Sequence, residues 1–187
     1  MFQNASFSIY GDLAQSLYAY RSLSDWKELQ NIFPALEIVR LNKSYRTTIE
    51  IMEEANKINQ LLGLDQAIPV IRHGEEVEYV SNSIMKLAKQ INQQYKTIAI
   101  ITKNQDQANH LYQQLKDHLD VTLIDSSHLT YNSSINIIPS YLSKGLEFDA
   151  VIIDQIGQYN KDHVLDMKLL YVSMTRALHK LYMVESK

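Results

Sequence analysis

The stretch Thr97-Ile-Ala-Ile-Ile-Thr102 decides the fold class, because its four central residues are all apolar. A strand with one wet face alternates apolar and polar residues, whereas a strand buried on both faces is apolar throughout, as in parallel sheets. Val151, Ile152 and Ile153 repeat the pattern. We therefore expect a mostly parallel sheet with helices on both faces.

Short β-branched runs alternate with helical stretches on either side of this segment, which is typical of βα units. Strands are expected at residues 7–10, 37–41, 77–80, 97–102, 121–124, 134–139, 150–154 and 180–185. Helices are expected after Thr47 or Thr48, after Ser81 or Ser83, after Asn104 or Asp106, and from about Asp162 to Leu178. Gly63 is expected to end the first helix, and residues 65–77 form a surface connection. The sequence thus predicts one α/β three-layer domain behind a short N-terminal arm.

Composition limits the functional classes. The 187 residues include 45% apolar and 21% charged residues, as in an ordinary soluble domain. The net charge of −3 is not that of an electrostatic nucleic-acid binder, so any strand contact must rely on local Arg, Lys and aromatic side chains. There is no cysteine, no signal peptide and no membrane-length apolar run. We expect a cytoplasmic protein with no membrane partner and no metal-ligand cluster.

Two segments carry aromatic and cationic side chains next to predicted strands, where α/β folds bind ligands at the carboxyl ends. In residues 10–21, Gly11 permits a turn that Asp12 can cap, Gln15 projects an amide, and Tyr20 and Arg21 suit stacking on unpaired bases. A capped turn and a Tyr-rich helix would explain the same residues.

The second segment, residues 41–48, places Tyr45 and Arg46 at a strand-to-helix junction, suited to stacking on a base and to binding phosphate. A packed Tyr and a solvated Arg are the structural alternative.

Two later segments add charged groups. Residues 141–149 offer Lys144 and Gly145, whose backbone can approach a ligand, and Glu147, which can accept from sugar hydroxyls. Residues 169–181 place Arg176 late in the last predicted helix, where it can neutralise a transferring phosphoryl group. A simple turn and an Arg paired with a carboxylate remain the alternatives. Neither segment has the GxxxxGK[ST] spacing of a phosphate-binding loop, which is absent from the whole sequence.

The order and wording of the four segments are specific. Gly-Asp-x-x-Gln-Ser-x-Tyr, Ser-Tyr-Arg-Thr, Ser-Lys-Gly-Leu-Glu-Phe-Asp and Leu-Tyr-Val-x-x-Thr-Arg-Ala together resemble helicase motifs III to VI of the UvrD/Rep-type superfamily 1. The resemblance extends from about residue 7 to residue 185. It implies a RecA-like second motor domain (2A) of the P-loop NTPase fold, with no P-loop of its own. Residues 1–34 would end the first motor domain (1A) or link to it, and residues 35–187 would form domain 2A.

The resemblance also assigns roles. Gln15 matches the glutamine that contacts the γ-phosphate, and Arg46 and Arg176 match the two arginines that reach it across the domain cleft. Tyr45 matches the residue that stacks on adenine. Glu147 matches the acid that bonds the ribose, in a loop with Lys144 and Gly145. Tyr20 takes the place of an aromatic that stacks on single-stranded DNA, with Arg21 beside it.

The same resemblance implies partners and limits. It implies a 3′-to-5′ DNA helicase or translocase that uses ATP with Mg²⁺, partnered by domain 1A of the same polypeptide and by single-stranded or duplex DNA. No nucleotide is expected to stay bound to this chain alone, and no hydrolysis, because the groups that cradle Mg²⁺ and the β-phosphate are missing from the sequence.

Two departures from the family pattern qualify the resemblance. Pro139 and Tyr141 replace the usual Thr-x-His that opens motif V. The motif IV–V spacing leaves no room for a large 2B insertion and looks more like the compact HelD-like relatives. An alternative function is therefore a HelD-like remodelling factor that engages RNA polymerase.

Overall fold

A six-stranded, wholly parallel sheet forms the centre of the computed structural model, which describes residues 7–17, 23, 25–70, 72–81, 83–126 and 133–185. Its strand order is β3-β8-β7-β4-β6-β5. The strands are β3 (Glu78–Val80), β4 (Ile98–Thr102), β5 (Val121–Leu123), β6 (Ile135–Pro139), β7 (Phe148–Ile153) and β8 (Ala177–Val184). The stretch that predicted a two-sided buried strand is β4, which pairs with β6 on one side and β7 on the other. The predicted fold class is confirmed.

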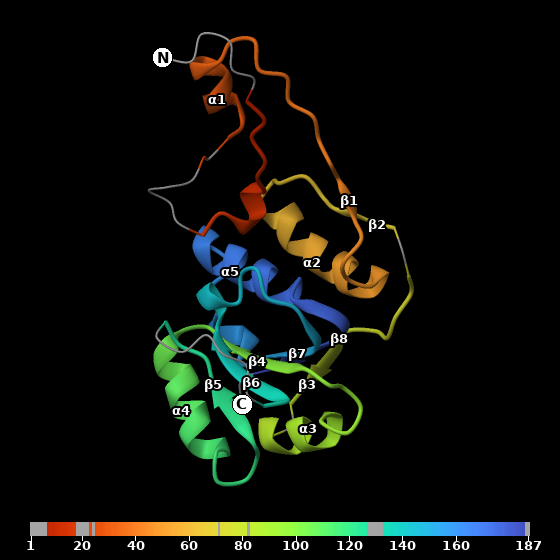
Figure 1. Ribbon diagram of the computed structural model, residues 1–187, viewed down its shortest axis with the longest axis vertical. Helices are drawn as coiled ribbons and strands as arrows, with labels where there is room; N and C mark the ends of the chain where they lie inside the picture. Colours follow the sequence, from red (N-terminus) through yellow and green to blue (C-terminus); the bar gives the residue numbers. More distant parts are fainter. Residues whose placement is uncertain are drawn as a thin grey trace.

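Helices cover both faces of this sheet (Figure 1). Helices α2 (Ile49–Leu61) and α5 (Val164–Met174) lie on one face, and α3 (Ile84–Ile91) and α4 (Gln105–Leu115) lie on the other. Alternate residues of β4 serve the two layers, because Ala99 and Ile101 pack with the first pair of helices and Ile98 and Ile100 with the second. Thr48 and Asn104 cap α2 and α4 through their side chains, as expected, and Gly63 follows α2 with a left-handed φ of +65°.

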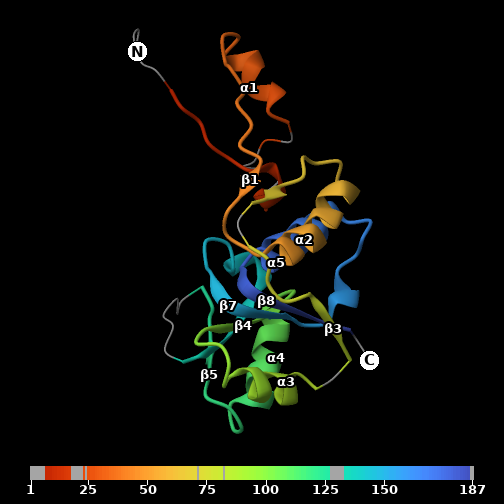
Figure 2. The same ribbon diagram turned by 90° about the vertical axis from the view of Figure 1, so that its right-hand side faces the viewer.

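The N-terminal arm projects away from the three layers (Figures 1 and 2). It contains a 3₁₀ turn (Leu13–Gln15) and the short helix α1 (Lys27–Ile32), and it returns to the domain through β1 (Lys43–Ser44). β1 pairs in parallel with β2 (Ile68–Pro69), inside the segment predicted as a surface connection. The ring of Trp26 packs on Gly11, where an added Cβ would lie 2.8 Å from Trp26 Cη2.

Three of the expected elements differ from the structure. Residues 7–10 and 37–41 form no strand, because no neighbouring strand pairs with them in the described part of the chain, and their apolar side chains are largely exposed. The last helix ends at Met174 rather than near Leu178, because β8 begins at Ala177. Arg176 therefore lies in the turn between α5 and β8 instead of on a helix.

Candidate nucleotide-facing site

Two of the predicted site residues lie at the amino-terminal edge of the sheet. Glu147 immediately precedes β7 and Arg176 immediately precedes β8, so both are at amino ends of strands. The β6–β7 connection explains the position of Glu147, because it contains only a 3₁₀ turn (Ser140–Leu142) and leads back across the sheet in eight residues. A backbone hydrogen bond of 3.0 Å from Phe148 N to Arg176 O holds the two turns together.

Arg46 completes this group from another element. It lies three residues before Ile49, the first residue of α2, and is followed by the buried Thr47 and the capping Thr48. Its Nε is 2.7 Å from Glu147 Oε1, and the two side chains remain 44% and 42% exposed. An ion pair with this much exposure contributes at most about 1 kcal/mol, so it can exchange readily for another partner.

Arg176 is held much more firmly, with only 1% of its surface exposed. Its Nε donates to Val172 O at 2.9 Å, Nη1 to Leu146 O at 3.2 Å and Nη2 to Thr175 Oγ1 at 3.2 Å. Because a guanidinium has five N–H donors, two remain uncommitted by these bonds. Burial and the nearby charge of Arg46 lower the pKa of Arg176 to about 10, so it stays protonated at neutral pH. Arg176 thus fixes the loop before β7, and two of its N–H donors remain for a ligand.

Gln15 is positioned through both its side chain and its backbone. Asp12 Oδ1 accepts from Ala14 N at 2.9 Å, and Asp12 Oδ2 accepts from Gln15 Nε2 at 2.8 Å. Lys144 Nζ donates to the carbonyl oxygen of Gln15 at 3.0 Å, from a loop in which Gly145 has a left-handed φ of +89°. The expected backbone freedom of Gly145 is therefore used, and Lys144 joins the third of the four sequence segments to the first.

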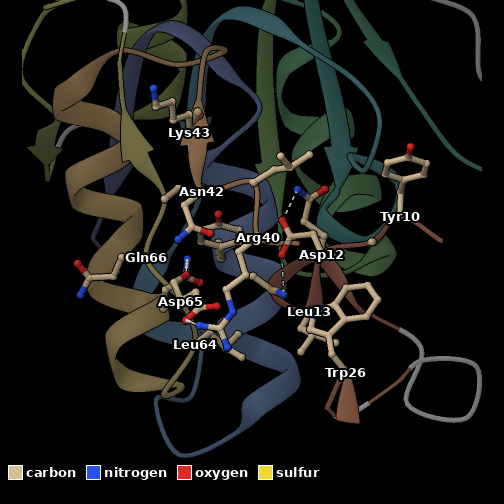
Figure 3. Close-up of a pocket in the computed structure, with 18 of the residues that line it drawn as sticks. Tyr10, Asp12, Leu13, Trp26, Arg40, Asn42, Lys43, Leu64, Asp65 and Gln66 are labelled. Atoms are coloured by element: carbon tan, nitrogen blue, oxygen red, sulfur yellow. Dashed lines mark hydrogen bonds and ion pairs between the residues drawn. The ribbon is translucent and has the colours of Figure 1, made fainter. Parts of the chain in front are cut away.

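A cavity of about 810 Å³ opens between the arm and helices α2 and α5 (Figure 3). Four predicted site residues line it together: Gln15, Tyr45, Arg46 and Arg176. Tyr45 leaves 59% of its surface open to solvent, so its ring face is available. Lys144, Gly145 and Glu147 are not part of the lining, although Glu147 is paired with Arg46 at its margin.

The cavity also contains residues that were not among the predicted site residues. In Figure 3, Asp12 and Trp26 lie on one side, and Arg40 approaches Asp65 on the other, with an Nη1–Oδ1 distance of 3.3 Å. Tyr171 lines the floor, where burial and the charge of Asp12 raise its pKa. The Asp-x-x-Gln spacing was a usable signal for the Asp12–Gln15 bond, whereas nothing local marks Arg40 or Tyr171.

Tyr20 and Arg21, predicted to contact DNA, fall outside the described residues. Within the described part of the chain, no three His, Asp or Glu side chains are grouped to hold a metal ion. Over the same residues, no helix is long and apolar enough to cross a membrane.

Comparison with known proteins agrees with the resemblance to UvrD/Rep-type helicases. Residues 135–184, which run from β6 to the end of β8, match the family model of the UvrD-like helicase C-terminal domain. A protein of Mycoplasma pneumoniae described as a probable DNA helicase is 25% identical over 94% of this chain. The ATP-dependent DNA helicase Rep of Buchnera aphidicola is 24% identical over 75% of it. The chain spans only 37% and 24% of the lengths of these two relatives.

A solved structure supports the same assignment. The C-terminal domain of a possible DNA helicase from Lactobacillus plantarum superimposes with a TM-score of 0.58 and 29% identity, covering 76% of this chain and 87% of that one. The residues that match the family model, 135–184, include the turns that bear Glu147 and Arg176. The chain is therefore similar to the C-terminal domains of UvrD-like DNA helicases, in its sequence over residues 135–184 and in its fold over most of its length.

Proposed function

We propose that this chain forms the second half of an ATP-driven DNA helicase or translocase motor, closing over a nucleotide held mainly by a first motor domain. One observation carries the proposal. Arg46 and Arg176 come from different elements and line one cavity, where Arg46 pairs with Glu147 and the charges of both act on Arg176. The planar N–H donors of two guanidinium groups in one cavity suit the oxygens of an anion such as a phosphoryl group.

The described residues fit one side of a nucleotide. Tyr45 presents an exposed ring that can stack on a base, and Glu147 can accept from a ribose hydroxyl once it releases Arg46. Arg176 has two N–H donors not used by its protein contacts. The sequence contains no phosphate-binding loop. The residues that hold the β-phosphate and Mg²⁺ would therefore belong to the first motor domain.

The Arg46–Glu147 pair gives this proposal a physical sequence of events. Without nucleotide, each side chain neutralises the other at 2.7 Å. With nucleotide bound, Arg46 turns to the phosphoryl group and Glu147 to the sugar, so the protein exchanges one solvent-screened contact for two new ones. Closing of the two domains in each cycle would then move the strand-facing surface, with Tyr20 and Arg21, along DNA.

Arg176 provides the test in a polypeptide that joins this chain to the first motor domain. Arg176→Ala and Arg176→Lys should lower ATP turnover by roughly 10³-fold or more, the usual worth of an arginine that stabilises phosphoryl transfer. Affinity for a fluorescent ADP should change by less than about threefold. Because Arg176 also braces Leu146 and Val172, thermal unfolding of each variant must be measured. Folded variants with near-normal turnover would rule out this role.

A further inference from the structure

A second cavity lies at the other edge of the sheet, between α4 and the residues that follow β7. It has a volume of about 340 Å³ and is lined by Asp106, Gln107, His110, Leu111, Gln114, Asp154, Gln155 and Gln158. Glu147 precedes β7 and Asp154 follows it, so six strand residues, or roughly 20 Å, separate this cavity from the nucleotide-facing residues. The carboxyl edge of a parallel sheet is where α/β folds bind ligands.

Asp154 is an unusual side chain to find at the bottom of such a cavity. It is only 6% exposed, yet among the described residues no Lys, Arg or His forms an ion pair with it and no side chain donates to it. Buried carboxylates are normally paired, because taking an isolated charge out of water is costly. The backbone N–H of Gln155 is its one bonding group, and burial raises the pKa of Asp154 to about 6.

The next residue, Gln155, is held in a strained conformation. Its φ of +48° lies in the left-handed region, which side chains other than Gly, Asn and Asp rarely adopt. The side-chain amides of Gln107, Gln158 and Gln155 are hydrogen-bonded in series and connect this loop to α4. Backbone strain of this kind clusters at binding sites, where the surrounding structure fixes it.

The lining selects the chemistry of a ligand. Asp106 and Asp154 give the cavity two carboxylates, and neither Lys nor Arg lines it. A phosphate or other anion would face uncompensated negative charge. A metal ion would lack ligands, because the described residues contain no group of three His, Asp or Glu suited to one. An organic cation with several N–H donors is what remains.

The shape of the cavity favours a long cationic side chain over a small free ion. Asp154 and Leu111 are buried at the bottom, while Asp106, His110, Gln114 and Gln158 are exposed at the rim. An alkyl stem can pack on Leu111 while its head group reaches the carboxylate, as amphipathic basic side chains do. Guanidinium is less strongly hydrated than ammonium and matches carboxylate and amide oxygens in plane, so it enters a buried site at lower cost.

We propose that this cavity binds the guanidinium group of an arginine side chain presented by another polypeptide segment, with Asp154 as its counter-ion and Leu111 beneath its stem. The proposal does not depend on the nucleotide-facing role of the opposite edge. It gives the domain a second docking site, which would allow a partner segment to be recognised while the other edge is occupied.

The probes are N-acetyl-arginine amide and its neutral isostere N-acetyl-citrulline amide, titrated into the isotope-labelled chain by NMR. The arginine probe should shift the backbone amides of Asp154, Gln155 and Leu111 in a saturable manner, and the citrulline probe should bind at least tenfold more weakly. The arginine probe should also lower the pKa of the Asp154 carboxyl. Equal binding of both probes would overturn the charge-based proposal.

Three variants separate this site from general electrostatic attraction. Asp154→Asn should weaken binding of the arginine probe at least tenfold, and Asp106→Asn at the rim by a few-fold. Asp117→Asn removes the same charge from an exposed position outside the cavity and should have no effect. If Asp117→Asn weakens binding as much as Asp154→Asn, or if none of the three does, there is no such site.

Discussion

Asp154→Asn is expected to stabilise the domain at neutral pH, because it removes a buried charge that lacks a partner without changing the shape of the side chain. Burial raises the pKa of Asp154 from 3.8 to about 6. The folded state therefore holds the proton more tightly than the unfolded state does. One pKa unit corresponds to 1.36 kcal/mol, so a shift of about two units is a penalty of roughly 3 kcal/mol when the group is ionised.

The pH window follows from the direction of the shift. Below about pH 4 the carboxyl is protonated in both states and contributes no penalty. Between about pH 4 and pH 6 the unfolded chain loses this proton first, and stability falls as the pH rises. Above about pH 6 the full penalty applies. The advantage of Asp154→Asn over the wild type should therefore grow by up to about 3 kcal/mol from pH 4 to pH 7.

Urea unfolding at several pH values measures this difference directly. The comparison of variant with wild type at each pH cancels groups with lowered pKa values, such as Glu50 and Asp166, which titrate equally in both proteins. Asp117→Asn, with the same change of charge at an exposed site, should give a nearly constant difference. A constant difference for Asp154→Asn as well would refute the reasoning, since it would mean that Asp154 ionises freely in the folded domain.

Two further predictions concern ligands of the proposed motor. In the two-domain polypeptide, wild-type protein should prefer ATP to at least one deoxy-analogue (2′ or 3′) by roughly 10–100-fold, the worth of a hydrogen bond to a carboxylate, and Glu147→Ala should lose that preference. Equilibrium binding of the analogues checks this, and a preference that survives in the variant would exclude the ribose role. Tyr20→Ala should weaken single-stranded DNA binding by about 1–3 kcal/mol at constant salt slope, whereas Arg21→Gln should lower the slope of log K against log salt by about 1. Fluorescence anisotropy over a salt series distinguishes the two, and an unchanged affinity for Tyr20→Ala would exclude stacking.

The sequence predicted the sheet well because its central strands are buried on both faces. The apolar runs at β4 and β7 are only five and six residues long, which favours a strand over a helix. Residues 7–10 and 37–41 have a similar composition but form no strand, since β structure requires a neighbour and composition alone does not supply one. The end of the last helix was placed too late because β8 begins within its apolar pattern.

The sequence named candidate site residues but not how the chain arranges them. Motif order identified Gln15, Tyr45, Arg46 and Arg176, which all line one cavity. Glu147 and Arg176 lie at the amino ends of β7 and β8, because the β6–β7 connection crosses back without an α-helix and α5 ends before Arg176. The Arg46–Glu147 pair joins positions about a hundred residues apart, so no local pattern reports it. Asp154 ends the strand predicted at residues 150–154, but no local pattern reports its isolation, which depends on what α4 does not provide.

Arg46→Ala is the most direct test of the central claim that this domain acts on a nucleotide held by another domain. Arg46 forms only a half-exposed ion pair, so its loss should cost at most about 1 kcal/mol of stability. Arg40→Ala is the matched control, since Arg40 lines the same cavity and is likewise in an exposed ion pair. Steady-state ATP turnover of the two-domain polypeptide should fall roughly 10³-fold for Arg46→Ala, with ADP affinity nearly unchanged and with Arg40→Ala close to wild type. Turnover of Arg46→Ala within tenfold of wild type would contradict the account.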